Sequence, residues 1–178
     1  RVFCGTMPSP AHPSRLYRLD PDGRLRRLLD NIGLSNGMGF TPDRIRMYYT
    51  DSRKREIYLF DYDGATGALT NQRLFASVPE DEGVPDGMTV DAEGCVWSAR
   101  WGGACAVRYT PEGREERRIA LSARKVSSVA FGGKDYSELY FTTAGGENPA
   151  ESGPGAGGLF RVRPGICGVP EFFSRIKV

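Results

Sequence analysis

The sequence predicts an all-β protein of the β-propeller class, with residues 1–178 forming a single partial propeller domain. One strand-like motif recurs at intervals of 43 to 49 residues, as VFCGT at 2–6, MYYTD at 47–51, VWSAR at 96–100 and LYFTT at 139–143. No stretch of about 12 residues shows the 3.6-residue periodicity of a helix. Four-stranded units that repeat at such an interval are typical of propeller blades. A long β-sandwich is the alternative, but it leaves the constant interval unexplained.

Each repeat adds three more strands to this motif, and Pro, Asp and Gly supply the turns between them. A first strand and turn precede the last three copies, as GFTPDRI, TVDAEGC and AFGGKDYSE. A third strand follows, as LYRLDPDG, IYLFDYDG, AVRYTPEG and GLFRVRPG, and then a fourth, as RLRRLL, TNQRLFA and REERRIAL. The first repeat has no counterpart of GFTPDRI, so we expect about four blades, the first of them incomplete. Open sheet edges would allow two such chains to associate.

Composition excludes several classes of partner and site. The net charge of +2 favours neither nucleic acid nor a membrane surface, and no apolar run approaches the roughly 18–20 residues of a membrane span. Four cysteines without a C-x-x-C pair indicate free thiols and a cytoplasmic protein. The single histidine, His12, excludes a multi-histidine zinc site.

Two stretches, LSNGMGF at 34–40 and VPDGMTV at 84–90, place Asn36 and Asp86 at the same point of successive repeats. In a propeller this is the loop residue before the strand nearest the axis, so both side chains are expected at one mouth of the channel. The next equivalent position is Ser127. Carboxamide and carboxylate oxygens suit Ca²⁺ and are tolerated by Mg²⁺, Mn²⁺ or Zn²⁺. The alternative is that Asn-Gly and Asp-Gly only form tight turns.

The ordered runs LSNGMGFTPDRIRMYYTDS, IYLFDYDGATG, VPDGMTVDAEGCVWSARWGG and AFGGKDYSELYFTTA resemble the gluconolactonase–regucalcin family, also called senescence marker proteins, over essentially the whole chain. The resemblance implies a six-bladed propeller, of which this chain covers about four C-terminal blades, and one divalent cation at the channel mouth. It implies hydrolysis of sugar lactones, with Asn36 as a metal ligand and Asp86 as a metal ligand and general base. The family's first-blade Glu and its R-x-N-D-G stretch precede the G-T-M motif and have no counterpart in this chain.

Four further residues are expected to contact substrate: His12, Arg100, Trp101 and Ser127. His12 lies in a loop shorter than that of the relatives, and Arg100 and Trp101 end the VWSARW run. Two readings compete with a lactonase. One is a non-catalytic calcium-binding or regulatory propeller, and the other is an inactive fragment that lacks the N-terminal metal ligand.

Overall fold

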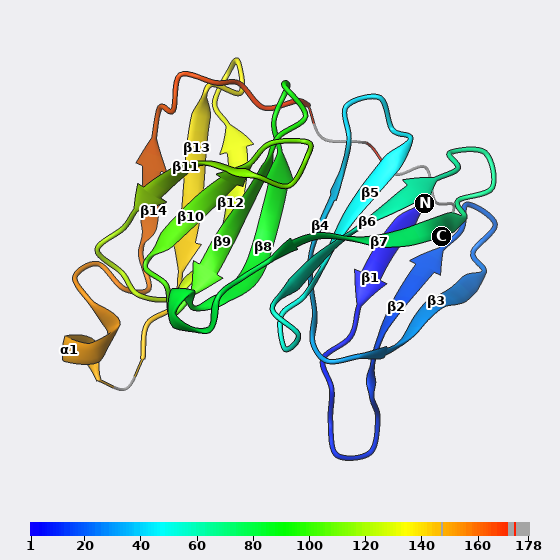
Figure 1. Ribbon diagram of the computed structural model, residues 1–178, viewed down its shortest axis with the longest axis horizontal. Coiled ribbons are helices and arrows are strands. Elements are labelled where there is room, and N and C mark those ends of the chain that lie inside the picture. Colours follow the sequence, from blue (N-terminus) through cyan, green and yellow to red (C-terminus); the bar gives the residue numbers. More distant parts are fainter. Residues whose placement is uncertain (147, 171–172, 174–178) are drawn as a thin grey trace.

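The computed structural model describes residues 1–146, 148–170 and 173, and it consists almost wholly of antiparallel strands in four sheets (Figure 1). Helical structure within these residues is limited to the one-turn η1 (Glu80–Glu82) and α1 (Pro149–Ser152). This confirms the all-β class that the repeats predict.

Each sheet is a run of neighbouring hairpins that corresponds to one sequence repeat. The first sheet contains β1 (Val2–Gly5), β2 (Ser14–Leu19) and β3 (Leu25–Ile32). The second contains β4 (Ser35–Phe40), β5 (Arg46–Asp51), β6 (Glu56–Tyr62) and β7 (Leu69–Ser77). The third contains β8 (Val84–Val90), β9 (Val96–Trp101), β10 (Cys105–Tyr109) and β11 (Glu115–Ala120). The fourth contains β12 (Val126–Gly132), β13 (Glu138–Thr143) and β14 (Leu159–Val162).

The inner strands of the last three sheets lie side by side, with β8 between β4 and β12. In the first sheet the strand at this edge is β1, which corresponds to the second strand of the other blades. The sheets therefore follow one another as blades around a common axis, and the first described blade has no inner strand. The expected partial propeller is confirmed.

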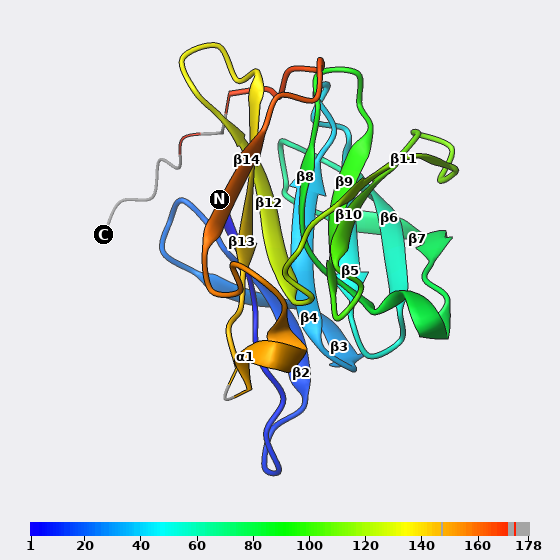
Figure 2. The same cartoon turned by 90° about the vertical axis from the view of Figure 1, so that its left-hand side faces the viewer.

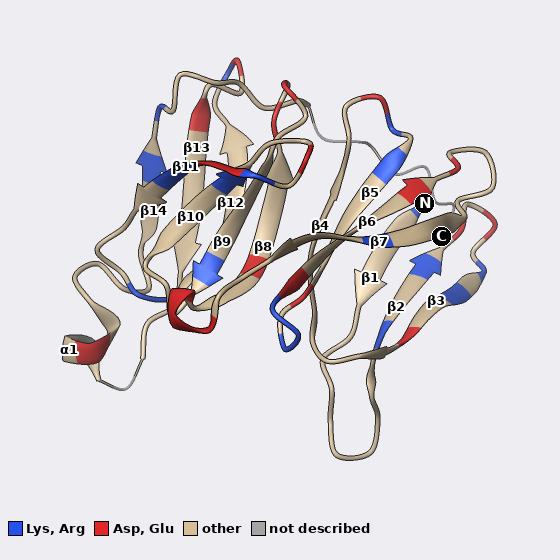
Figure 3. Ribbon diagram, in the orientation of Figure 1, with Lys and Arg blue, Asp and Glu red and all other residues tan. Residues whose placement is uncertain are grey.

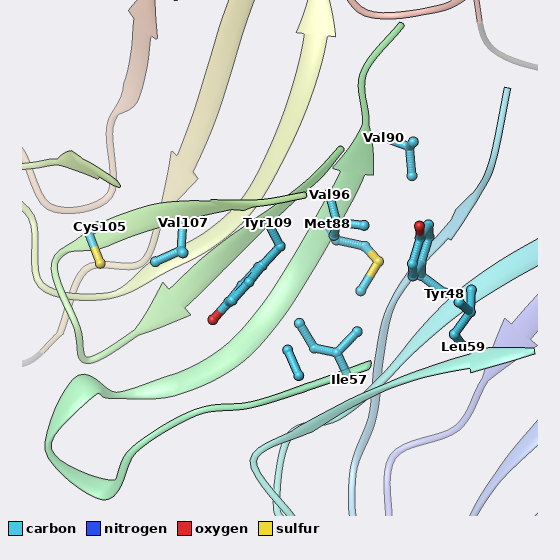
Figure 4. Packing of buried hydrophobic residues seen from close by; sticks show 10 residues of the cluster. Tyr48, Ile57, Leu59, Met88, Val90, Val96, Cys105, Val107 and Tyr109 are labelled. Carbon is cyan, nitrogen blue, oxygen red and sulfur yellow. The ribbon is translucent and has the colours of Figure 1, made fainter. Parts of the chain in front are cut away.

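Apolar layers between successive sheets hold the blades together. Side chains alternate between the two faces of a strand, so each sheet contributes one face to each neighbouring layer. The layer between the second and third sheets is shown in Figure 4, where Tyr48 and Ile57 face Met88, Val107 and Tyr109. Similar layers join the first sheet to the second and the third to the fourth.

The turn between β8 and β9 is held by a buried ionic network. The Asp91 carboxylate is fully buried and accepts hydrogen bonds from the backbone N–H groups of Glu93 and Cys95, both at 3.0 Å. It also accepts from Trp97 Nε1 at 2.9 Å and from Arg108 Nε at 2.8 Å. A buried charge with this many donors is fully compensated, and this network fixes the inner hairpin of the third blade.

The structure also shows the state of the cysteines and the distribution of charged residues. All four cysteines are free, and Cys105 pairs with Arg100 across the hairpin, so it does not face Cys95. Within the described residues no helix is long and apolar enough to cross a membrane. Charged residues lie mainly on loops and outer strands, whereas β4 and β12 contain none and β8 contains only Asp86 (Figure 3).

Candidate functional site

Each of the three inner strands contains a β-bulge near its start. The strand pairing shifts between Ser35 and Met38 in β4, between Pro85 and Met88 in β8, and between Val126 and Ser128 in β12. The residues without a pairing partner are Asn36 and Gly37 in β4, Asp86 and Gly87 in β8, and Ser127 in β12, so the three polar residues lie at corresponding bulges. They lie within the strands, however, and not in the loops before them as the sequence suggested. A bulge redirects a side chain away from the regular alternation of a strand, which explains why these positions can carry polar groups.

Glycine follows the bulge residue in two of these strands because neighbouring inner strands approach closely there. A Cβ atom on Gly37 would lie 2.5 Å from the Asp86 carbonyl oxygen. A Cβ atom on Gly87 would lie 2.8 Å from Ser128 Cα. Neither contact is compatible with a side chain, so glycine is required for β4, β8 and β12 to pack against one another.

Asn36 and Asp86 meet across two blades. The Asn36 side chain and the Gly87 N–H lie close enough to the Asp86 carboxylate to favour its charged form. Burial raises the pKa of Asp86 to about 6, and the nearby Asn36 and Gly87 donors only partly offset that effect. No Lys or Arg among the described residues forms a salt bridge with Asp86, so its negative charge is uncompensated by protein.

A serine that the sequence analysis did not single out lies between the two strands. Ser52, just after β5, accepts a hydrogen bond from Asn36 Nδ2 at 3.0 Å and donates one to the Pro85 carbonyl at 2.7 Å. Its side chain is buried. The sequence offered one signal for it. Ser52 directly follows the MYYTD motif, the position that Trp101 occupies after VWSAR in the next repeat.

Arg100 is not at the rim where we expected it. It is fully buried on β9, where its guanidinium donates to Ser98 Oγ at 2.6 Å and to the Tyr109 hydroxyl. Burial lowers its pKa. The alternation of β9 turns Arg100 into the layer between the second and third blades, so this side chain is not available to a ligand at the mouth.

The other candidate substrate residues are accessible but are not all together. His12 is exposed in a loop closed by the paired backbone hydrogen bonds of Ser9 and His12. This loop projects from the end of the molecule at which β4 and β8 begin (Figures 1 and 2). Trp101, 38% exposed, ends β9 with Lys125 Nζ 5.4 Å from its ring centre. Ser127 Oγ lies 2.9 Å from Thr142 Oγ1.

As a cation site, this arrangement offers one carboxylate and one carboxamide. Across residues 1–146, 148–170 and 173, no group of three or more His, Cys, Asp or Glu side chains could hold a metal ion. Asp86 and Asn36 nevertheless fit a hard cation, because both are oxygen ligands, they are in contact, and the carboxylate has no cationic partner in the described protein.

The sequence is similar to one family of known proteins. A family model described as the SMP-30/gluconolactonase/LRE-like region matches residues 1–145. A pentonolactonase, XacC, of Haloferax volcanii is 47% identical over 185 residues, which cover 100% of this chain and 64% of that protein. Regucalcin of Danio rerio is 39% identical over 181 residues, covering 97% of this chain and 61% of the relative.

A solved structure shows the same fold. It is described as a calcium-binding protein, regucalcin, from Agrobacterium tumefaciens, and it superposes with a TM-score of 0.86 at 27% identity. The match covers 94% of this chain and 58% of that one. The chain thus spans about three-fifths of the length of these relatives.

Proposed function

This chain belongs to the SMP-30/gluconolactonase/LRE-like family, and on that premise we propose that it takes part in the metal-dependent hydrolysis of sugar lactones. The observation that carries the proposal is the contact between Asn36 and Asp86, which come from adjacent blades and meet at the bulges of β4 and β8. A propeller that needed only tight turns at these positions would have no reason to bring a carboxamide and an uncompensated carboxylate together.

Asn36 and Asp86 would hold a single divalent cation. Ca²⁺ is the best match to two hard oxygen ligands, with Zn²⁺, Mg²⁺ and Mn²⁺ as alternatives. A relative whose structure is described as calcium-binding supports this choice. When bound, the cation supplies Lewis-acid polarisation of the lactone carbonyl. Asn36 is neutral and would therefore bind without cancelling the charge of the ion.

Asp86 is the proposed general base. Its carboxylate would accept a proton from the attacking water and return it to the ring oxygen as the ester bond breaks. Its half-buried position limits competition from bulk water for that proton.

The proposed substrate is a small sugar lactone. Trp101 offers an exposed aromatic face beside Lys125, a surface on which a sugar ring can stack. Ser127 can donate a hydrogen bond at the third bulge, and His12 can contact substrate from the projecting loop. The name of the Haloferax relative favours a five-carbon lactone over a six-carbon one.

The test is hydrolysis of glucono-1,5-lactone and of a pentonolactone, followed as acid release with Ca²⁺, Zn²⁺, Mn²⁺ or Mg²⁺ added. We expect cation-dependent turnover that falls by about 100-fold or more in Asp86→Asn, because both a ligand and the base are lost. Equal rates for the parent and variant would refute the catalytic role. Calcium binding without turnover would support the non-catalytic reading. Binding and turnover that appear only when sequence upstream of Arg1 is supplied would show that the 178 residues lack part of the site.

Open sheet edges support a second, independent proposal about partners. Among the described strands, β1 and β14 are edge strands of the first and last sheets, each paired on one side only, as are the edge strands of the sheets between them. Unpaired edges of this kind favour association of two copies through strand pairing. Light scattering should then show a dimer, and a monomer at all concentrations would rule this out.

A further inference from the structure

We propose that Ser52 is a positioning residue that fixes the orientation of the Asn36 carboxamide and links it to the strand that carries Asp86. This inference rests on the proposed function, because it concerns how the same two ligands are arranged for a cation. Ser52 lies on neither inner strand and would not itself contact the ion.

The hydroxyl of Ser52 has a single proton, and the structure shows where that proton goes. Ser52 Oγ donates to the Pro85 carbonyl at 2.7 Å. The hydroxyl can then only accept from its other neighbour, so the Asn36 group that faces it must be the amide nitrogen, at 3.0 Å. Asn36 Oδ1 is consequently turned away from Ser52. This hydroxyl thus favours the orientation of the carboxamide in which Oδ1 is free for a cation.

The same hydroxyl joins the two ligand-bearing strands. Asn36 belongs to β4, and Pro85 is the residue immediately before Asp86 in β8. The backbone of Ser52 is held independently, since its N–H donates to the Leu34 carbonyl at 3.0 Å. The bridge therefore runs from a fixed turn of the second blade to the ligand strand of the third.

This bridge is specific to the blade pair that carries both ligands. The residue just before each bulge pairs with Asp51, Arg100 or Thr143 on the neighbouring strand. The next residues along the chain, Ser52, Trp101 and Ala144, therefore occupy equivalent positions in the three blades. Trp101 and Ala144 have no hydroxyl and cannot form the same bridge. If the packing of blades required such a bridge, it would be expected in every blade. The Ser52 bridge instead occurs only at the blade pair that contains Asn36, among the three compared.

The experiment compares cation binding in the parent protein with that in Ser52→Ala, measured by calorimetric titration with Ca²⁺. We expect the dissociation constant to rise about 10- to 100-fold, as for other residues that orient metal ligands. The matched control is Thr50→Val, two residues earlier at the end of β5. The Thr50 hydroxyl is buried and has no hydrogen-bond partner in the described structure, so this variant should bind Ca²⁺ as the parent does. An unchanged affinity in Ser52→Ala would overturn the inference.

A second pair of variants covers the case in which Ser52→Ala folds poorly. Ser52→Thr and Ser52→Val have the same shape and differ only in the hydroxyl, so we expect Thr to bind Ca²⁺ at least tenfold more tightly than Val. Equal affinities would refute a role for the hydroxyl.

A crystal structure of the cation-free variant separates this inference from the proposed function. In Ser52→Val or Ser52→Ala, the Asn36 carboxamide should leave its present orientation, and this readout requires no bound ion. If the parent binds no cation, the proposed function fails while this measurement still decides the role of Ser52. An unmoved Asn36 would overturn the positioning role whatever the activity.

Discussion

Replacing Asp86 by Asn should stabilise the cation-free protein at neutral pH, although it destroys the proposed site. Asp86 has a pKa of about 6 in the folded chain, against 3.8 for an unperturbed carboxyl, because burial disfavours its charged form. Below about pH 3.8 the carboxyl is protonated in both states and has no effect. As the pH rises from about 4 to about 6, the unfolded state loses this proton while the folded state keeps it, so the folded state is progressively disfavoured, and above about pH 6 the penalty is constant.

The size of this penalty follows from the shift. About two pKa units correspond to about 3 kcal/mol above pH 6. The carboxyl is only half-buried, and solvent screening reduces this to about 1–2 kcal/mol. Asn has nearly the same shape and carries no charge, so Asp86→Asn should recover that amount. For a chain of this length the gain is roughly 3–6 °C in the unfolding midpoint.

The measurement is urea unfolding in the presence of a chelator at several values between pH 4.5 and 8. The variant's advantage should be smallest at pH 4.5, grow up to about pH 6 and stay constant from there to pH 8. Adding Ca²⁺ should stabilise the parent and leave the variant unchanged. A variant that is less stable than the parent at pH 8 without cation would refute the account of Asp86 as an uncompensated charge.

The remaining predictions concern the surrounding framework and the ion. Asp91→Asn should destabilise the protein by up to about 3–5 kcal/mol at pH 7, measured by urea unfolding, because it removes the fully buried carboxylate that pairs with Arg108 and leaves only the more exposed Glu93 and Glu116 as its charge partners; a loss below 1 kcal/mol would contradict this. Gly87→Ala should lower the unfolding midpoint and weaken cation binding together, since the new methyl group meets Ser128 and displaces the β8 bulge. Chelation of the parent should lower its midpoint at pH 8 by an amount that grows with the Ca²⁺ concentration removed, measured by thermal scanning; a midpoint independent of Ca²⁺ would contradict a cation site.

The blade pattern could be predicted because it depends on local signals that each repeat carries independently. The strands expected at 2–6, 47–51, 96–100 and 139–143 correspond to β1, β5, β9 and β13. Turn residues and alternation specify such hairpins without reference to distant parts of the chain. The absence of an inner strand in the first blade was also visible, as a missing counterpart of GFTPDRI.

The candidate site could be predicted only in part. The equivalence of Asn36 and Asp86 follows from the repeat. The bulges that contain them depend on the pairing register between neighbouring strands, which the sequence pattern does not reveal. Arg100 was misplaced for a related reason. Its position at a strand end suggested the rim, whereas strand alternation turned it inward, where the Ser98 and Tyr109 hydroxyls accept its hydrogen bonds. Ser52 was missed because its role depends on a carbonyl 33 residues away.

The geometry of the site depends on packing between blades as much as on the ligands themselves. Asn36 and Asp86 belong to different sheets, so no local element holds them at a fixed separation. Two features do so together: the close approach that Gly37 permits between β4 and β8, and the apolar layer in which Tyr48 and Met88 belong to the second and third blades. A substitution that loosens this layer should therefore weaken cation binding even though it touches neither ligand. Conversely, a bound cation would join the two sheets directly, so cation affinity and the cohesion of these blades must rise and fall together.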